Sequence, residues 1–173
     1  MNPGDRVMLV SENRPEWCIA DLAIMAAGGV TVPTYVTNTE RDHAHILGDS
    51  GASVAVVSTA KLARSLMPAV LRSTHCRAVI GIEDIRIGQA GDVAHHDWNA
   101  LIAAHAPDVD KIAAGARFAR DDLACIIYTS GTGGAPRGVR QHHGAILHNV
   151  AGCIDIFEYD FGWGDEVFLS FLP

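Results

Sequence analysis

Residues 128–139, with the sequence YTSGTGGAPRGV, combine hydroxyl groups, glycines and a cation in one short segment. Thr129, Ser130 and Thr132 offer hydroxyl donors, and Arg137 supplies a permanent cation that can contact phosphate oxygens in a bidentate way. Glycine permits positive φ and close backbone approach, so several N–H groups can converge on one ligand. The glycines of the segment are Gly131, Gly133, Gly134 and Gly138. These residue types together predict a phosphate-binding loop.

The charge distribution of the chain favours the same interpretation. The formal net charge is -7 and the pI is near 5.6, which argues against a general nucleic-acid binder because such a protein needs a basic face. No Asp or Glu occurs from Leu123 to Ile154, whereas two arginines and three histidines do. The segment is therefore predicted to be a local positive site in an acidic chain.

The residue spacing of the segment also bears on other interpretations. Clusters of glycine and proline usually make a tight surface turn and nothing more. The segment lacks the Lys-hydroxyl ending of G-x-x-x-x-G-K-[ST], and Pro136 stands where G-x-G-x-x-G needs its last glycine. Ser130 is not in a G-x-S-x-G nucleophile elbow, so a hydrolase is not indicated. A different nucleotide-binding family is required.

The elements around this segment alternate between strands and helices. Apolar, β-branched runs predict strands, and segments with helix start and stop signals lie between them. The expected strands are 6–12, 30–36, 52–58, 78–82 and 123–130, and the expected helices are 14–29, 39–51, 60–72 and 143–155. This alternation predicts an α/β fold with a mostly parallel sheet and helices on both faces. Residues 83–122 read as a surface excursion with one helix near 97–105.

Cysteines, histidines and the N-terminus indicate an intracellular protein without a metal centre. The four cysteines show no CxxC spacing, so reduced, buried thiols are expected. Two histidine pairs, at positions 43 and 45 and at positions 95 and 96, could suggest metal ligands. No third or fourth ligand follows either pair at a recognisable spacing, so these histidines are expected to be solvated on the surface. Residues 1–10 lack the features of a secretory signal, and residues 17–36 are interrupted by Asp21, Gly28, Gly29 and Pro33. We expect a cytoplasmic protein without a transmembrane span, peripheral to a membrane at most.

The segment YTSGTGGAPRGV resembles the signature loop of the adenylate-forming (AMP-binding) superfamily, Y-T-S-G-T-T-G-x-P-K-G-V, found in acyl-CoA synthetases, luciferases and peptide-synthetase adenylation domains. The stretches PGDRV, NRPEW, ADLAIMAAGGVTVPTY and DSGA resemble the upstream half of that superfamily's large N-terminal domain. TYVTNT and DEVFLSFLP resemble its long-chain fatty acyl-CoA synthetase branch. The resemblance implies that residues 1–173 form a single partial domain, the upstream part of an AMP-binding domain, with the excursion at about 83–122 and no C-terminal domain.

The resemblance also implies a reaction and its site. A carboxylic acid reacts with ATP to give an acyl adenylate and pyrophosphate, and coenzyme A then takes the acyl group, with Mg2+ assisting. The residues implied to bind the β and γ phosphates are Thr129, Ser130, Gly131, Thr132, Gly133 and Gly134, with Arg137 shielding the charge. The family's magnesium-binding acidic residue and catalytic lysine would follow Pro173, so neither of them is expected in this chain, and no residue is assigned a catalytic role.

Two positions depart from the family pattern. Gly133 replaces a threonine, which removes a hydroxyl donor, and Arg137 replaces a lysine, which keeps the charge in a larger, planar group. His143 stands where the family commonly has a histidine, and we interpret it as a packing residue at a helix start rather than an acid or base. The main hypothesis is a fragment of a long-chain acyl-CoA synthetase that is inactive alone. The alternative is a noncatalytic remnant or interaction module. Either is expected to self-associate through exposed sheet edges or apolar surface.

Overall fold

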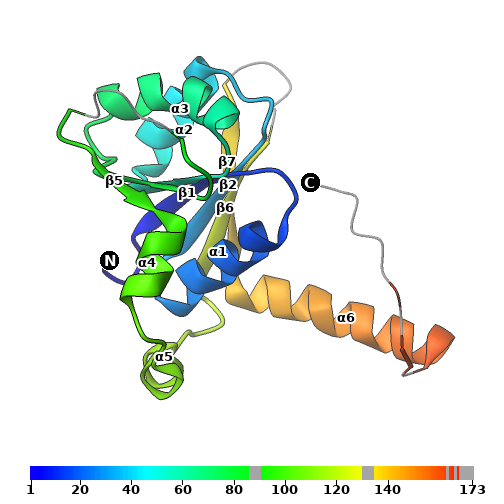
Figure 1. Ribbon diagram of the computed structural model, residues 1–173. Helices are drawn as coiled ribbons and strands as arrows, with labels where there is room; N and C mark the ends of the chain where they lie inside the picture. Colours follow the sequence, from blue (N-terminus) through cyan, green and yellow to red (C-terminus); the bar gives the residue numbers. More distant parts are fainter. Residues whose placement is uncertain (86–90, 130–134, 163, 166, 168–173) are drawn as a thin grey trace.

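The computed structural model describes residues 1–85, 91–129, 135–162, 164–165 and 167, and within them seven strands form one sheet (Figure 1). The strands are β1 (Arg6–Val10), β2 (Val30–Thr34), β3 (Val54–Val57), β4 (Ala78–Gly81), β5 (Ala94–Asp97), β6 (Leu123–Thr129) and β7 (Arg137–His142). The helices are α1 (Pro15–Ala26), α2 (Glu40–Ser50), α3 (Ala60–Arg72), α4 (Trp98–Ala104), α5 (Val109–Gly115) and α6 (His143–Phe161).

The sheet is parallel except at one edge. Its strand order is β5-β4-β3-β1-β2-β6-β7, and β6 with β7 forms the antiparallel pair. The other neighbouring strands pair in parallel, which confirms the predicted mostly parallel α/β fold. Parallel strands place their carboxyl ends at one edge of the sheet, where α/β proteins bind ligands.

Alternating residues of β1 serve two cores, one on each face of the sheet. Met8 and Val10 belong to the core beneath α2 and α3, whereas Val7 and Leu9 belong to the core beneath α1. Figure 1 shows α2 and α3 on one face and α1 on the other. A strand segment buried on both faces has to be apolar, which explains the unbroken apolar run at residues 7–10 of β1.

Helix α2 has well-defined signals at both ends. The Thr39 hydroxyl accepts a hydrogen bond from the Asp42 backbone N–H, and the Asp42 carboxylate accepts one from the Thr39 N–H, which completes the predicted capping box. Gly51 ends the helix in the left-handed region, with φ of 62°. These contacts fix the length and direction of α2, the helix that lies against the β6–β7 hairpin.

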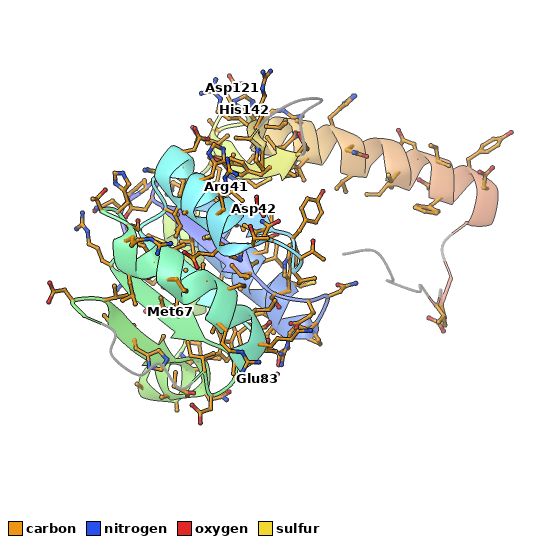
Figure 2. All side chains as sticks on the ribbon, turned by 90° about the horizontal axis from the view of Figure 1, so that it is seen from above. Arg41, Asp42, Met67, Glu83, Asp121 and His142 are labelled. Atoms are coloured by element: carbon orange, nitrogen blue, oxygen red, sulfur yellow. The ribbon has the colours of Figure 1, made fainter. Side chains whose placement is uncertain are left out.

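Helix α6 extends away from the sheet in both views (Figures 1 and 2). It runs to Phe161, six residues beyond the predicted end at 155, and Leu147, Val150 and Ile154 are exposed along it. None of the described helices is both long and apolar enough to cross a membrane.

The structure corrects two expectations about single residue types. Cys76 and Cys125 are buried as expected, but Cys18 and Cys153 are exposed. His43 is 1% exposed and therefore not a surface histidine, because it occupies a core-facing position of α2. His95 and His96 are exposed, as expected. Within residues 83–122, β5 adds an edge strand to the sheet, and α4 and α5 follow it.

Candidate functional site

The candidate site lies at the end of the hairpin formed by β6 and β7. In the antiparallel register Tyr128 pairs with Gly138, and Thr129 pairs with Arg137. Two of the predicted site residues, Thr129 and Arg137, are therefore opposite each other in the two stems of the loop, and both are exposed. The remaining predicted site residues, Ser130, Gly131, Thr132, Gly133 and Gly134, lie outside the described residues.

The hairpin ends at the edge of the sheet that normally binds ligands. Strand β6 runs parallel to β2, with Thr31 beside Cys125, so Thr129 is at the carboxyl end of a parallel strand. Arg137 begins the returning strand and carries its guanidinium group at the same end. A hydroxyl donor and a permanent cation are thus presented together at this edge, an arrangement suited to an anion.

Helix α2 contacts both stems of the hairpin. The Tyr128 hydroxyl donates a hydrogen bond to Asp49 Oδ2 over 2.5 Å, and His45 Nε2 donates one to the carbonyl oxygen of Pro136 over 2.7 Å. His45 also packs its ring edge-on against Tyr128, with centroids 6.2 Å apart. Since residues 45 and 49 are one turn apart, they share a face of α2. Figure 2 shows this helix, in cyan, beside the yellow hairpin strands.

Tyr128 is the buried anchor of the hairpin. Its side chain is 4% exposed, and burial raises the pKa of its hydroxyl, with the hydrogen bond to Asp49 acting in the same direction. The phenol therefore stays protonated over the physiological range and remains a donor to the Asp49 carboxylate. Tyr128 supports the site and is not an ionisable group of it.

Gly138 serves the packing of Tyr128. A Cβ added at Gly138 would lie 2.8 Å from Ile126 Cγ2 and 3.1 Å from Tyr128 Cζ. The sequence interpretation grouped Gly138 with the glycines that turn N–H groups toward a ligand. The structure gives it a different role, because its missing side chain leaves room for the tyrosine ring across the hairpin.

Sequence reasoning missed three residues that shape the site: His45, Asp49 and Tyr128. Tyr128 opens the quoted loop segment, and Asp49 opens the DSGA stretch, so both were visible as parts of motifs. Their contact joins residues 79 positions apart, which no local pattern reports. His45 carried no signal beyond its neighbour His43, which belongs to the core instead.

A separate cavity of about 410 Å³ lies at the opposite end of the sheet, where β2 and β6 begin. Phe118 and His143 line it, and their rings stack with centroids 4.7 Å apart. His143 is thus a packing residue at the first position of α6, as predicted. The cavity is not part of the hairpin site, because it adjoins Leu123 at the other end of β6.

Comparison with known sequences identifies relatives along the whole chain. A family model described as AMP-binding enzyme matches residues 1–173. The long-chain-fatty-acid–CoA ligase FadD15 of Mycobacterium tuberculosis is 34% identical over 154 residues, covering 86% of this chain and 24% of that protein. The peroxisomal long chain acyl-CoA synthetase 7 of Arabidopsis thaliana is 30% identical over 178 residues, covering 100% of this chain and 24% of that protein. The chain spans about a quarter of the length of these relatives.

Comparison with solved structures identifies the same type of fold. A benzoate CoA ligase from Burkholderia xenovorans superposes with a TM-score of 0.68 at 23% identity, covering 93% of this chain and 28% of that one. The likeness extends over nearly all elements of the chain, and it shows that this sheet and its helices have the arrangement of part of a CoA ligase.

Proposed function

The chain belongs to the AMP-binding enzyme family, and we propose that it supplies the phosphate-binding hairpin of an ATP-dependent acyl-CoA synthetase. Its relatives include long-chain-fatty-acid CoA ligases from bacteria and plants, which favours a long-chain fatty acid as the carboxylate. The substrates of the proposed reaction are ATP, as its magnesium complex, the fatty acid and coenzyme A. Because the chain carries free cysteines in its described residues, we propose the cytoplasm as its compartment, with at most peripheral contact to a membrane.

The proposed reaction has two steps. A carboxylate oxygen attacks the α-phosphorus of ATP, the bond to the bridging oxygen breaks, and pyrophosphate leaves with the electron pair to give the acyl adenylate. The thiolate of coenzyme A then attacks the acyl carbonyl, and AMP leaves as the thioester forms. In the first step two anions must approach each other, so the protein has to neutralise charge and hold the reacting atoms in line.

The described residues are assigned to the leaving pyrophosphate. The Thr129 hydroxyl would donate to a phosphate oxygen, and the Arg137 guanidinium would hold two oxygens and offset their charge. Residues 130–134 would contribute backbone N–H groups, a role that comes from the family loop alone. Among the residues that the structure describes, no group of three His, Cys, Asp or Glu side chains could hold a metal ion, so we assign no magnesium ligand.

One observation carries the proposal most directly. Thr129 and Arg137 are paired across the hairpin at the carboxyl end of β6, the edge where α/β sheets bind ligands. The pairing presents a hydroxyl donor and a permanent cation together at that edge.

Isothermal titration calorimetry of the chain with Mg-ATP and with inorganic pyrophosphate tests the proposal. We expect both to bind, and Arg137→Ala to weaken binding about tenfold because a charge-assisted hydrogen bond to phosphate is lost. Arg137→Lys should retain most of the affinity, since it restores the family residue. Arg117→Ala is the matched control, because Arg117 lines the cavity at the other end of the sheet. Absence of binding by the unaltered chain would contradict the proposal and favour a noncatalytic interaction module.

We also propose that the chain self-associates through α6, with a second copy as the partner. Leu147, Val150, Ile154 and Phe157 repeat at the three- and four-residue spacing of a helix–helix seam and are 41–53% exposed. The carboxylates of α6, Asp155, Glu158 and Asp160, all lie in its last third. An antiparallel pair would place them beside the positive amino end of the partner helix, which favours that orientation.

A further inference from the structure

The two contacts between α2 and the hairpin fall next to the proposed phosphate-binding residues. Asp49 holds Tyr128, which immediately precedes Thr129, and His45 holds Pro136, which immediately precedes Arg137. We infer that His45 and Asp49 are positioning residues that hold the two stems so that Thr129 and Arg137 face one phosphate group. This inference rests on the proposed function of the hairpin.

The carboxyl half of β6 depends on α2 for support. Strand β2 pairs with β6 with Thr31 beside Cys125, and β2 ends three residues later at Thr34, so β6 extends past the end of β2 near Tyr128. Strand β7, which pairs with β6, is the edge strand of the sheet. An edge strand has a strand neighbour on one side, so contacts from a helix on one face restrict where the end of the hairpin can lie.

The chemistry of the two contacts suits a rigid support. The Pro136 carbonyl can only accept, so His45 Nε2 carries the proton in this contact. The Tyr128 hydroxyl donates to a carboxylate, which makes a stronger hydrogen bond than a neutral acceptor would. The His45 ring also packs edge-on against Tyr128, so the two supporting contacts lie side by side.

Rigid stems affect the affinity of the site for phosphate. A ligand that binds a loose hairpin has to order it, and that ordering entropy is subtracted from the binding free energy. With the stems held by α2, most of this ordering precedes binding. Loss of either contact should therefore weaken phosphate binding even though neither His45 nor Asp49 is assigned a contact with the ligand.

The test compares Mg-ATP affinity in matched variants by calorimetry, at a temperature where urea unfolding shows each variant to be folded. We expect His45→Ala and Asp49→Ala to raise Kd about tenfold. His45→Gln keeps a donor near the Nε2 position and Asp49→Asn keeps an acceptor, so each should stay within about threefold of the unaltered chain. His96→Ala removes an exposed histidine on β5 and should leave Kd unchanged.

The outcomes separate this inference from the proposed function. If the unaltered chain binds Mg-ATP and both alanine variants bind it equally well, the positioning role is overturned while the phosphate site stands. If the unaltered chain does not bind Mg-ATP, the proposed function fails and the inference falls with it. Should the alanine variants not fold, Tyr128→Phe removes only the hydroxyl and is expected to raise Kd about fivefold. An unchanged Kd in that variant would overturn the inference.

Discussion

Gly138 occupies a point in the hairpin where a side chain has no room. We expect Gly138→Ala to lower the free energy of unfolding by about 1–3 kcal/mol, because the new methyl group would overlap Ile126 and the Tyr128 ring. Urea unfolding measures the change. Gly152→Ala is the control, since an added Cβ there meets nothing within 4 Å and α6 should gain up to about 1 kcal/mol in helix propensity. Equal stability of the two variants would contradict the packing role of Gly138.

His43 makes stability depend on pH. Burial lowers the pKa of His43 in the folded protein, and the Asp42 carboxylate opposes only part of that effect. The unfolded chain, with a histidine pKa of about 6.5, therefore binds more protons below that pH, and the free energy of unfolding falls as the pH drops. The drop between about pH 7.5 and about pH 5.5, measured by urea unfolding, should be smaller in His43→Leu.

An exposed histidine, His96, provides the control for that measurement. His96→Leu is the control variant, because it removes an imidazole that is exposed on edge strand β5 rather than buried in the core. An equal drop in the His43→Leu variant and in the unaltered chain would show that the buried imidazole does not cause the dependence.

At the scale of elements, the capping box of α2 is expected to support the site indirectly. Thr39→Ala removes the hydroxyl that accepts from the Asp42 N–H and should lower the free energy of unfolding by about 1 kcal/mol. Thr37→Ala, in the exposed turn just before, should change it by less than about 0.5 kcal/mol. Thermal or urea unfolding checks both, and a loss no larger in Thr39→Ala than in Thr37→Ala would refute the contribution of the cap.

The central helices could be predicted from the sequence because their start and stop signals lie within the helices or next to them in the chain. Helix α3 was predicted at 60–72 and is observed at Ala60–Arg72, and the capping box correctly placed the start of α2. Strand β7 was not predicted, because Arg137–His142 is polar and becomes a strand only by pairing with β6. Strand β5 was missed for a similar reason, since AHHD is wholly exposed at the sheet edge.

The site was predictable only in part. Thr129 and Arg137 followed from the composition and order of the loop, and the structure pairs them across the hairpin. The supporting contacts of His45 and Asp49 join segments 91 and 79 positions apart in the sequence, so they depend on how α2 packs against the sheet. Sequence spacing carries no information about such packing, and the role of Gly138 became clear only from its distance to Tyr128.

For the whole molecule, light scattering tests association through α6. We expect a mass near twice 18.4 kDa at high concentration, and a shift toward the monomer in Ile154→Lys because a charge would enter the apolar seam. Ile156→Lys is the control, since Ile156 is also an exposed isoleucine of α6 and lies on a different face of the helix from the seam. A monomeric mass for the unaltered chain, or equal effects of both variants, would exclude the proposed pair.

The central claim is that the β6–β7 hairpin binds the triphosphate of ATP, and a crystal structure of the chain grown with Mg-ATP tests it most directly. The account predicts β- and γ-phosphate density between the Thr129 hydroxyl and the Arg137 guanidinium at the carboxyl end of β6. Density for the triphosphate elsewhere, such as in the cavity lined by Phe118 and His143, would contradict it.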